Sequence, residues 1–261
     1  MNYQHLLIDR SYEHIALVTL NRPDKLNTLN SALMAEIESV IDEFHSEVEI
    51  RVVIFTGSGK LFSGGADLTE KWNHLTMLQT MRNLQRGPNL IRKIYGMEQI
   101  TIAAINGGAF GGGACIASAC DFRIADKNCK AGFPESKLGM NLSWIALPLV
   151  VHLIGPTYAK EMVILGKNNN AETLLKWGFI SEITSKENLI NRAIEIAKEY
   201  AAMPPIAAQM IKKSINNIVS PLDKAIMHMD RDQWLLTSKS EDFKEAITAF
   251  FSKRQGTFKG N

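Results

Sequence analysis

The chain has 261 residues, a formal net charge of +2 and 46% hydrophobic residues, so it can bury a substantial core in one α/β domain with at most a small appendage. A charge this small argues against nucleic acid or a membrane surface as a partner, and the apolar run near Ile145–Val151 is too short to span a bilayer. The three cysteines form no C-x-x-C pair, the six histidines show no zinc spacing, and no secretory signal is evident. We therefore expect reduced thiols, no metal and a cytoplasmic location.

The first part of the chain predicts a strand, a helix and a further strand. Strands are expected at Leu6–Asp9 and Ile15–Leu20, joined by a polar turn. Apolar residues then recur at helical spacing over Ser31–Ser46, with Asn30 as the N-cap. The continuous apolar run within Arg51–Thr56 predicts the next strand. This order implies a right-handed crossover and a largely parallel sheet.

The middle of the chain contains two glycine-rich stretches. Gly57–Leu68 reads as a long loop with open backbone, and Glu70–Tyr95 follows it as a helical stretch. Ile102–Asp121 reads as a buried strand, a turn with five glycines and a helix of small residues over Gly113–Ala119. The glycine spacing fits neither a dinucleotide fingerprint nor a P-loop. Two interpretations stay open: a tight structural turn, or an oxyanion site in which N–H groups at a helix start receive developing negative charge.

The last part of the chain is mostly helical in its sequence pattern. We predict helices at Gly155–Gly166, Ala171–Gly178, Leu189–Ala202, Pro205–Asn216, Pro221–Leu236 and Glu241–Phe251, and short strands at Phe122–Ile124 and Phe179–Ile183. We divide the chain into an active-site core over residues 1–195 and a C-terminal helical region over residues 196–261. The pair Lys212-Lys213 is too short for a nucleic-acid stripe and reads as a solvated helix face.

Glu135 is the candidate general base. Phe133 and Pro134 place it beside apolar neighbours, where loss of hydration would raise its pKa toward neutrality. On the residues alone, a solvent-facing loop carboxylate is an equal alternative.

The stretch over 70–95 offers weaker candidates. The stripe of Trp72, Leu75 and Leu78 could line an acyl group, but we favour a place in the core. His74 is a less favoured catalytic candidate.

Several short stretches together resemble the crotonase family, also called the enoyl-CoA hydratase/isomerase family. They occur in the family's order across nearly the whole chain: Asn21-Arg22-Pro23 with Lys25-Leu26-Asn27, Phe62–Leu68, the glycine run, Phe133-Pro134-Glu135 with Leu138-Gly139, and Phe251–Lys259. The resemblance implies an α/β fold with a crotonase-like ββα spiral core and a helical C-terminal trimerisation region. It also implies an enzyme that acts on an acyl-CoA thioester, as a homotrimer or a dimer of trimers. Coenzyme A is then part of the substrate, and no separate cofactor is expected.

The resemblance also implies roles for individual residues. Glu135 matches the family's catalytic glutamate, and the backbone N–H groups of Ala66 and Gly112 match its two oxyanion donors. Substrate-binding roles fall on Lys25, Leu26, Ala66, Asp67, Leu68, Gly111, Gly112, Trp144 and Lys253.

This chain departs from the family's pattern at two places. Hydratases of the family carry a second glutamate where this chain has Cys115, which we expect to be packed rather than reactive, with a nucleophilic role as the less favoured alternative. Met140–Trp144 replaces a glycine-rich run that borders the acyl group, so Trp144 is expected to reshape that region. Ser143 stands where dienoyl-CoA isomerases carry an acidic residue, which argues against that activity.

Four functions stay open at this point. A single carboxylate favours a Δ3–Δ2 enoyl-CoA isomerase, in which Glu135 removes a proton from one carbon and returns it to another. The alternatives are a hydratase for a short or branched enoyl-CoA, a decarboxylase of a malonyl-type thioester, and a non-catalytic acyl-CoA-binding protein. The two oxyanion stretches and Glu135 argue against the last of these.

Overall fold

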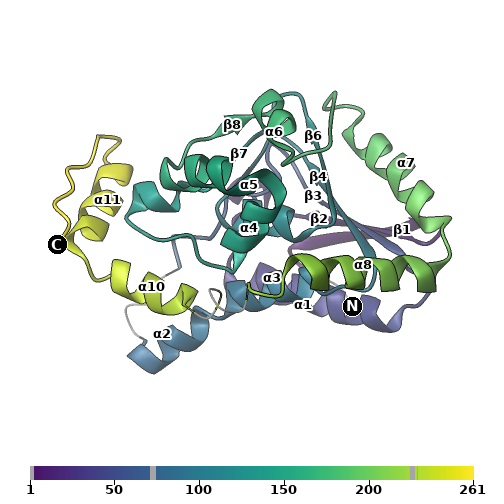
Figure 1. The fold of residues 1–261 in the computed structure, drawn as a ribbon, viewed down its shortest axis with the longest axis horizontal. Coiled ribbons are helices and arrows are strands. Elements are labelled where there is room, and N and C mark those ends of the chain that lie inside the picture. Colours follow the sequence, from purple (N-terminus) through teal and green to yellow (C-terminus); the bar gives the residue numbers. More distant parts are fainter. Residues whose placement is uncertain (1–2, 71–74, 224–226, 228) are drawn as a thin grey trace.

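The computed structural model describes residues 3–70, 75–223, 227 and 229–261. A six-stranded sheet runs through the centre in the order β1-β2-β3-β4-β6-β9 (Figure 1). Its strands are β1 (Leu6–Tyr12), β2 (Ile15–Leu20), β3 (Val52–Gly57), β4 (Ile100–Ile105), β6 (Phe122–Asp126) and β9 (Glu182–Thr184). Only the β1–β2 pair is antiparallel in this sheet. The parallel pairing of β2 with β3, connected through α1 (Ser31–Ser46), confirms the predicted crossover.

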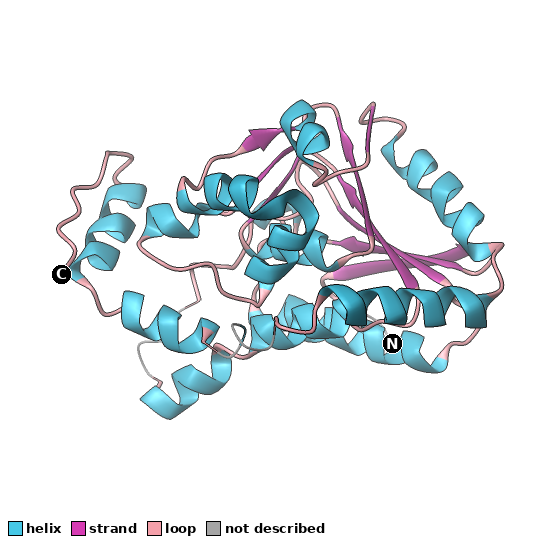
Figure 2. Ribbon diagram, viewed as in Figure 1, coloured by secondary structure: helices cyan, strands magenta, loops and turns pink. Residues whose placement is uncertain are grey.

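Helices cover both faces of the six-stranded sheet (Figure 2). Buried residues of α7 (Leu189–Ala201) pack against one face, on Ile54, Ile102 and Ile124. On the other face α1, α3 (Arg86–Tyr95) and α4 (Gly112–Ala119) form the larger part of the core. Because β3 and β4 are covered on both faces, their side chains are almost all buried, as their continuous apolar sequences predict.

A second, three-stranded sheet lies beside the first, in the order β5-β7-β8. Its strands are β5 (Gly108–Phe110), β7 (Lys130–Gly132) and β8 (Asn169–Asn170). The other elements are η1 (Pro23–Lys25), α2 (Met77–Asn83), η2 (Pro134–Leu138), α5 (Ala146–Ile164), α6 (Ala171–Trp177), α8 (Pro205–Val219), α10 (Asp230–Thr237) and α11 (Glu241–Phe251). The C-terminal helices α10 and α11 lie at the opposite end of the molecule from α7 (Figure 1).

Several predicted elements have other bounds in the structure. β1 runs on to Tyr12, because a bulge after Asp9 lets the strand continue where a turn was predicted. The stretch predicted as helical over Glu70–Tyr95 contains two helices, α2 and α3, of which α2 begins with a capping box at Thr76. Leu78 of α2 is exposed, so its predicted place in the core is wrong. Trp72 and His74 lie outside the described residues.

Two helix predictions missed their starts. The helix predicted from Gly155 begins at Ala146, because the apolar run there is helical and Gly155 only interrupts it, with φ 74° and ψ 163°. Pro148 is tolerated in the first turn, where the backbone N–H groups have no intrahelical partner. In the predicted Pro221–Leu236 helix, residues 221–223 form a turn, Met227 is helical, and α10 runs from Asp230 to Thr237.

The predicted strand at Phe179–Ile183 also starts too early. The N–H of Phe179 donates to the carbonyl of Leu174 at 2.9 Å, which ends α6, so the strand begins at Glu182.

Lys212 corrects a further prediction. Its side chain is buried rather than solvated: Nζ lies 2.7 Å from Asp121 Oδ2 and donates to the Gln99 carbonyl at 2.7 Å. These contacts fasten α8 to the start of β4, since Asp121 also accepts from Thr101. In the described parts of the chain, no helix has the length and apolar character needed to cross a membrane.

Candidate active site

The ends of two paired strands bring the predicted base and one predicted oxyanion donor together. β5 and β7 are parallel neighbours, so the residues that follow them lie at the same edge of the small sheet. Gly111 and Gly112 follow β5, and Glu135 comes shortly after β7. The N–H of Gly111 donates to the carbonyl of Gly132 at 3.0 Å, which fixes the two strand ends side by side.

The second predicted donor, Ala66, reaches the same place through a bridge between its loop and β5. Ser63 donates from its N–H to Gly108 at 3.2 Å and accepts from Phe110 at 3.0 Å. This pairing brings Gly65 so close to α4 that a Cβ on Gly65 would lie 3.5 Å from the nitrogen of Gly112. The peptide that follows Gly65 carries the Ala66 N–H, so both predicted donors belong to one small region.

Both of these N–H groups are candidates for binding a ligand atom. In the described ranges, neither Ala66 nor Gly112 donates its backbone N–H to another group of the chain. Gly112 is the first residue of α4, where a helix leaves its N–H groups unpaired and carries the positive end of its dipole. Two such donors can stabilise negative charge that develops on a carbonyl oxygen.

Glu135 faces this region with an unsatisfied carboxylate oxygen. The Cβ position of Gly111 lies 2.8 Å from Glu135 Oε1, a space that only glycine leaves open, and Gly111 has φ 48°. Oε2 is shielded from solvent and has no hydrogen-bond partner within the described chain, although other parts of the residue reach the surface. Burial raises the pKa of Glu135 to about 7, against 4.5 for an ordinary glutamate. The solvent-facing alternative for Glu135 is therefore wrong.

Cys115 is packed inside α4. Its side chain is 1% exposed, and burial, with the charges of Glu135 and Asp230 as smaller causes, raises the pKa of the thiol well above its ordinary value. The thiol is therefore protonated at neutral pH, which contradicts the nucleophilic alternative. The position that carries a glutamate in the family's hydratases holds no charge here.

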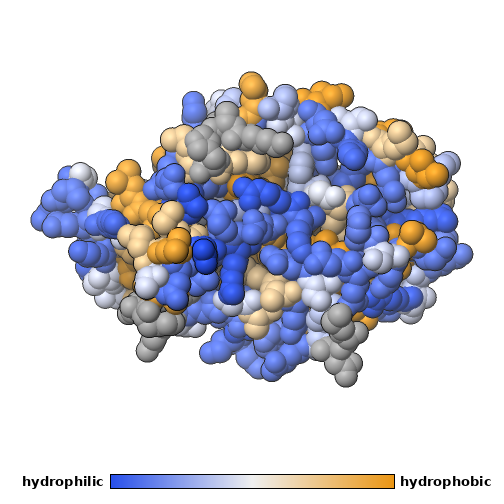
Figure 3. Space-filling model, turned by 90° about the horizontal axis from the view of Figure 1, so that it is seen from below, coloured by the Kyte–Doolittle hydropathy of each residue, from blue (hydrophilic) through white to orange (hydrophobic). Residues whose placement is uncertain are grey.

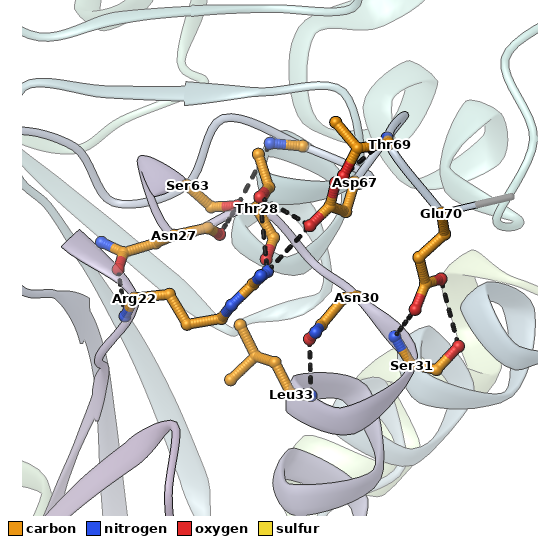
Figure 4. A network of polar contacts seen from close by, with 11 residues as sticks. Arg22, Asn27, Thr28, Asn30, Ser31, Leu33, Ser63, Asp67, Thr69 and Glu70 are labelled. Atoms are coloured by element: carbon orange, nitrogen blue, oxygen red, sulfur yellow. Dashed lines mark hydrogen bonds and ion pairs between the residues drawn. The ribbon is translucent and has the colours of Figure 1, made fainter. Parts of the chain in front are cut away.

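A network of polar contacts fixes the loop that carries Ala66 (Figure 4). Arg22 and Asp67 form an ion pair of 3.1 Å whose side chains are only 13% and 8% exposed. Arg22 also donates to the carbonyl of Thr28 at 2.5 Å, and the Thr28 hydroxyl donates to Asp67 at 3.3 Å. Asp67 directly follows Ala66, so these contacts fix the peptide that carries the predicted donor.

A second set of contacts in the same network holds the preceding turn. The Ser63 hydroxyl donates to the carbonyl of Asn27 at 2.8 Å and accepts from the N–H of Gly65 at 3.2 Å. Glu70 accepts from both the N–H and the hydroxyl of Ser31, at the start of α1 (Figure 4). Arg22 was not predicted to have a role of its own, although the stretch Asn21-Arg22-Pro23 contributed to the family resemblance.

The other predicted binding residues fall into two groups. Lys25, Leu26, Leu68 and Lys253 are exposed, and in the described chain neither lysine side chain forms an ion pair. The Asp67 side chain is occupied by Arg22, Thr28 and Thr69. Its backbone N–H donates to the carbonyl of Leu29 at 3.1 Å and its carbonyl accepts from Glu70 at 3.3 Å, so Asp67 supports the loop rather than offering a group to a ligand.

Trp144 lies directly beside one predicted oxyanion donor, Gly112. A Cβ on Gly112 would come within 2.7 Å of its indole ring. The described residues contain no group of three or more His, Cys, Asp or Glu that could hold a metal ion.

Comparison with known proteins identifies the family. The sequence model described as "Enoyl-CoA hydratase/isomerase" matches residues 10–261. The chain belongs to the enoyl-CoA hydratase/isomerase family. Among curated relatives, the short-chain-enoyl-CoA hydratase of Clostridium acetobutylicum is 34% identical over 243 residues, which cover 92% of each chain. The crotonyl-CoA hydratase of Syntrophomonas wolfei is 31% identical over 260 residues, which cover 99% of each chain.

Solved structures of the enoyl-CoA hydratase/isomerase family have the same fold. The crystal structure of an enoyl-CoA hydratase from Bacillus anthracis matches with a TM-score of 0.80 and 31% identity, over 99% of this chain and 100% of that one. A monofunctional enoyl-CoA isomerase from M. smegmatis matches with a TM-score of 0.72 and 28% identity, over 83% of this chain and 94% of that one. The predicted crotonase fold and a family enzyme acting on an acyl-CoA thioester are thereby confirmed.

Proposed function

We propose that this protein is an enoyl-CoA isomerase, which moves a carbon–carbon double bond by a proton transfer through Glu135. The observation that carries the proposal is the buried carboxyl of Glu135. One of its oxygens has no partner among the described residues, and it lies beside two backbone N–H groups for which those residues supply no acceptor. Cys115 is neutral where a second carboxylate would be needed to hold an attacking water from the other side. One carboxyl is sufficient for isomerisation, because the same group can remove a proton and return it.

The proposed reaction has two proton transfers and no net change in mass. The carboxylate of Glu135 removes a proton from the carbon between the double bond and the thioester carbonyl. The electron pair moves onto the thioester oxygen, where the N–H groups of Ala66 and Gly112 donate to the developing charge. The protonated Glu135 then gives its proton to the far carbon of the former double bond, and the carbonyl re-forms. Loss of one such donor typically costs about 2.7–4 kcal/mol of barrier.

The pKa of Glu135 suits both halves of this cycle. At a pKa of about 7, the carboxylate is basic enough to accept a proton and the carboxylic acid is acidic enough to return it. An ordinary exposed glutamate would be a much weaker base. The burial of Glu135 therefore supports an acid–base role over a structural one.

Hydration of a short enoyl-CoA is the second candidate. It is favoured by the names of the relatives above, which are hydratases for short-chain enoyl-CoA and crotonyl-CoA. In this chain, Glu135 would have to direct the water without a carboxylate at position 115.

The remaining features of the proposal concern the coenzyme, the assembly and the compartment. Lys25 and Lys253, whose ammonium groups form no ion pair with the described residues, are proposed to supply charge for the phosphates of coenzyme A. The protein is proposed to form a homotrimer or a dimer of trimers. Cys115, Cys120 and Cys129 are free and buried thiols, which supports a reducing compartment such as the cytoplasm.

Replacement of Glu135 tests the proposed role. Glu135→Gln keeps the shape of the side chain but removes the base, so turnover of a 3-enoyl-CoA should be lost while its affinity stays within about threefold of wild type. The exposed Glu172→Gln is the matched control, which removes one carboxylate elsewhere and should leave both quantities unchanged. Substantial turnover by Glu135→Gln would contradict the assignment.

A further inference from the structure

Trp144 lies in a turn with an unusual backbone conformation. Its backbone has φ 63° and that of Ile145 has φ 52°, a left-handed conformation that is strained for a β-branched residue such as isoleucine. The strain persists only because neighbouring contacts hold this turn. The turn directly precedes α5 and follows the loop that connects it to Glu135.

The indole ring of Trp144 fills the space between two helices. On α3 it lies against Gly87, where any Cβ would overlap the ring. On α4 its far edge comes within 2.7–2.9 Å of the Cβ position of Gly112. Glycine at both positions is what allows the ring to enter, and the ring ends beside the N–H proposed to bind the thioester oxygen.

Helix α10 holds the turn that carries Trp144. Asp230, the first residue of α10, accepts a hydrogen bond of 2.5 Å from the N–H of Ile145, and its side chain is buried. Asn141, from the same loop, donates to Gln233 of α10 at 3.1 Å. Burial raises the pKa of Asp230 to about 6, so the carboxylate is largely ionised at neutral pH and makes a charge-assisted bond.

We propose that Trp144 is the wall that limits the length of the acyl chain, and that Asp230 is the positioning residue that holds this wall in place. The inference rests on the proposed function, because it requires a thioester oxygen at Gly112. An acyl chain on that thioester carbonyl must pass the indole edge, while Glu135 lies at the neighbouring Gly111. The ring fills the space between α3 and α4 that a long chain would need, so the substrate class is a short-chain enoyl thioester.

The first test measures binding of unreactive thioesters, so it does not depend on the type of reaction. By calorimetry, wild type should bind butyryl-CoA at least about tenfold more tightly than decanoyl-CoA, and Trp144→Ala should reverse or abolish that preference. An unchanged preference in Trp144→Ala would overturn the proposal. Failure of both esters to bind wild type would overturn both this proposal and the proposed function, whereas binding with the predicted preference but without turnover of an enoyl-CoA would overturn only the latter.

The second test uses Asp230 and remains informative if Trp144→Ala does not fold. Asp230→Asn keeps an oxygen that accepts from Ile145, so its chain-length preference should match wild type. Asp230→Leu removes the acceptor and should shift the preference toward decanoyl-CoA by about tenfold, mainly through the affinity for the long ester. Equal preferences in these two variants would show that Asp230 has only a general structural role and would contradict the positioning claim.

Discussion

At the residue scale, the properties of Glu135 follow from what surrounds its two carboxylate oxygens. One oxygen faces Gly111 and the other is shielded and unpartnered in the described structure. Burial is the largest cause of its raised pKa and no cation of the described residues contributes, so the neutral form is favoured. Phe133 and Pro134 alone left burial and solvent exposure of Glu135 as equal alternatives, and the family resemblance singled it out as the candidate base. The unpartnered oxygen could not be predicted from the sequence, since it depends on the strand pairing of β5 with β7.

The raised pKa predicts the pH dependence of catalysis. Glu135 must be ionised to remove a proton, so kcat/KM for a 3-enoyl-CoA should rise with pH and level off above a midpoint of about 7. A pH–rate profile of purified enzyme measures this midpoint. A midpoint near the ordinary glutamate value would show that Glu135 is hydrated in the working enzyme.

The same shift predicts how stability changes with pH. The folded protein has a Glu135 pKa of about 7 and the unfolded chain one near 4.5, so ionisation between these values destabilises the folded state. Glu135→Gln avoids that cost. Its free energy of unfolding, from urea titrations, should therefore exceed that of wild type by about 2 kcal/mol at pH 8 and by much less at pH 5. A difference independent of pH would contradict this account.

At the element scale, the local sequence pattern predicts helices and long strands, but it does not predict contacts between residues far apart in the sequence. Asn30 caps α1 by accepting from the N–H of Leu33 at 2.9 Å, and the helix bounds match their prediction because cap and apolar spacing are both local. The Arg22–Asp67 ion pair joins residues 45 positions apart in the sequence, and no local sequence pattern around either residue predicts it. The same holds for the contact between Trp144 and Gly87. Short strands such as β8 were missed because two residues carry no periodic signal.

Removal of Arg22 should affect both stability and catalysis. Arg22→Met leaves Asp67 buried without its cation, which should lower the free energy of unfolding by about 3 kcal/mol. It should also lower kcat more than it raises KM, because the Ala66 peptide loses its support. The matched control is Lys93→Met, which breaks an exposed pair with Asp42 and should cost less than about 1 kcal/mol. Equal costs for the two variants would contradict the role assigned to Arg22.

At the scale of the whole molecule, many large apolar side chains are exposed on the surface of the described chain. Figure 3 shows apolar side chains gathered toward the end of the molecule that holds α10 and α11, with smaller patches elsewhere. On α8, Ile211, Ile215 and Ile218 are exposed at helical spacing, and Ile218 is 75% exposed. Such a face is typical of a surface that another chain covers, which supports the proposed trimer.

A charge placed on this face of α8 tests the proposed assembly. Ile218→Asp would bury an unpaired charge in an interface, so it should shift the protein from trimer or hexamer to smaller species. Asn217→Asp introduces the same charge one residue away and is the control. Light scattering after size-exclusion chromatography measures both masses. A wild-type monomer, or equal masses for the two variants, would contradict the proposal for α8.

The most direct test of the central claim is a paired assay of the purified protein. A 2-enoyl-CoA and the corresponding 3-enoyl-CoA are supplied separately, and the products are identified by mass. Interconversion of the two esters without a change in mass, lost in Glu135→Gln, is the result that single-base isomerisation predicts. A product heavier by one water from the 2-enoyl ester, with no interconversion of the two, would contradict it and establish a hydratase that works without a carboxylate at position 115.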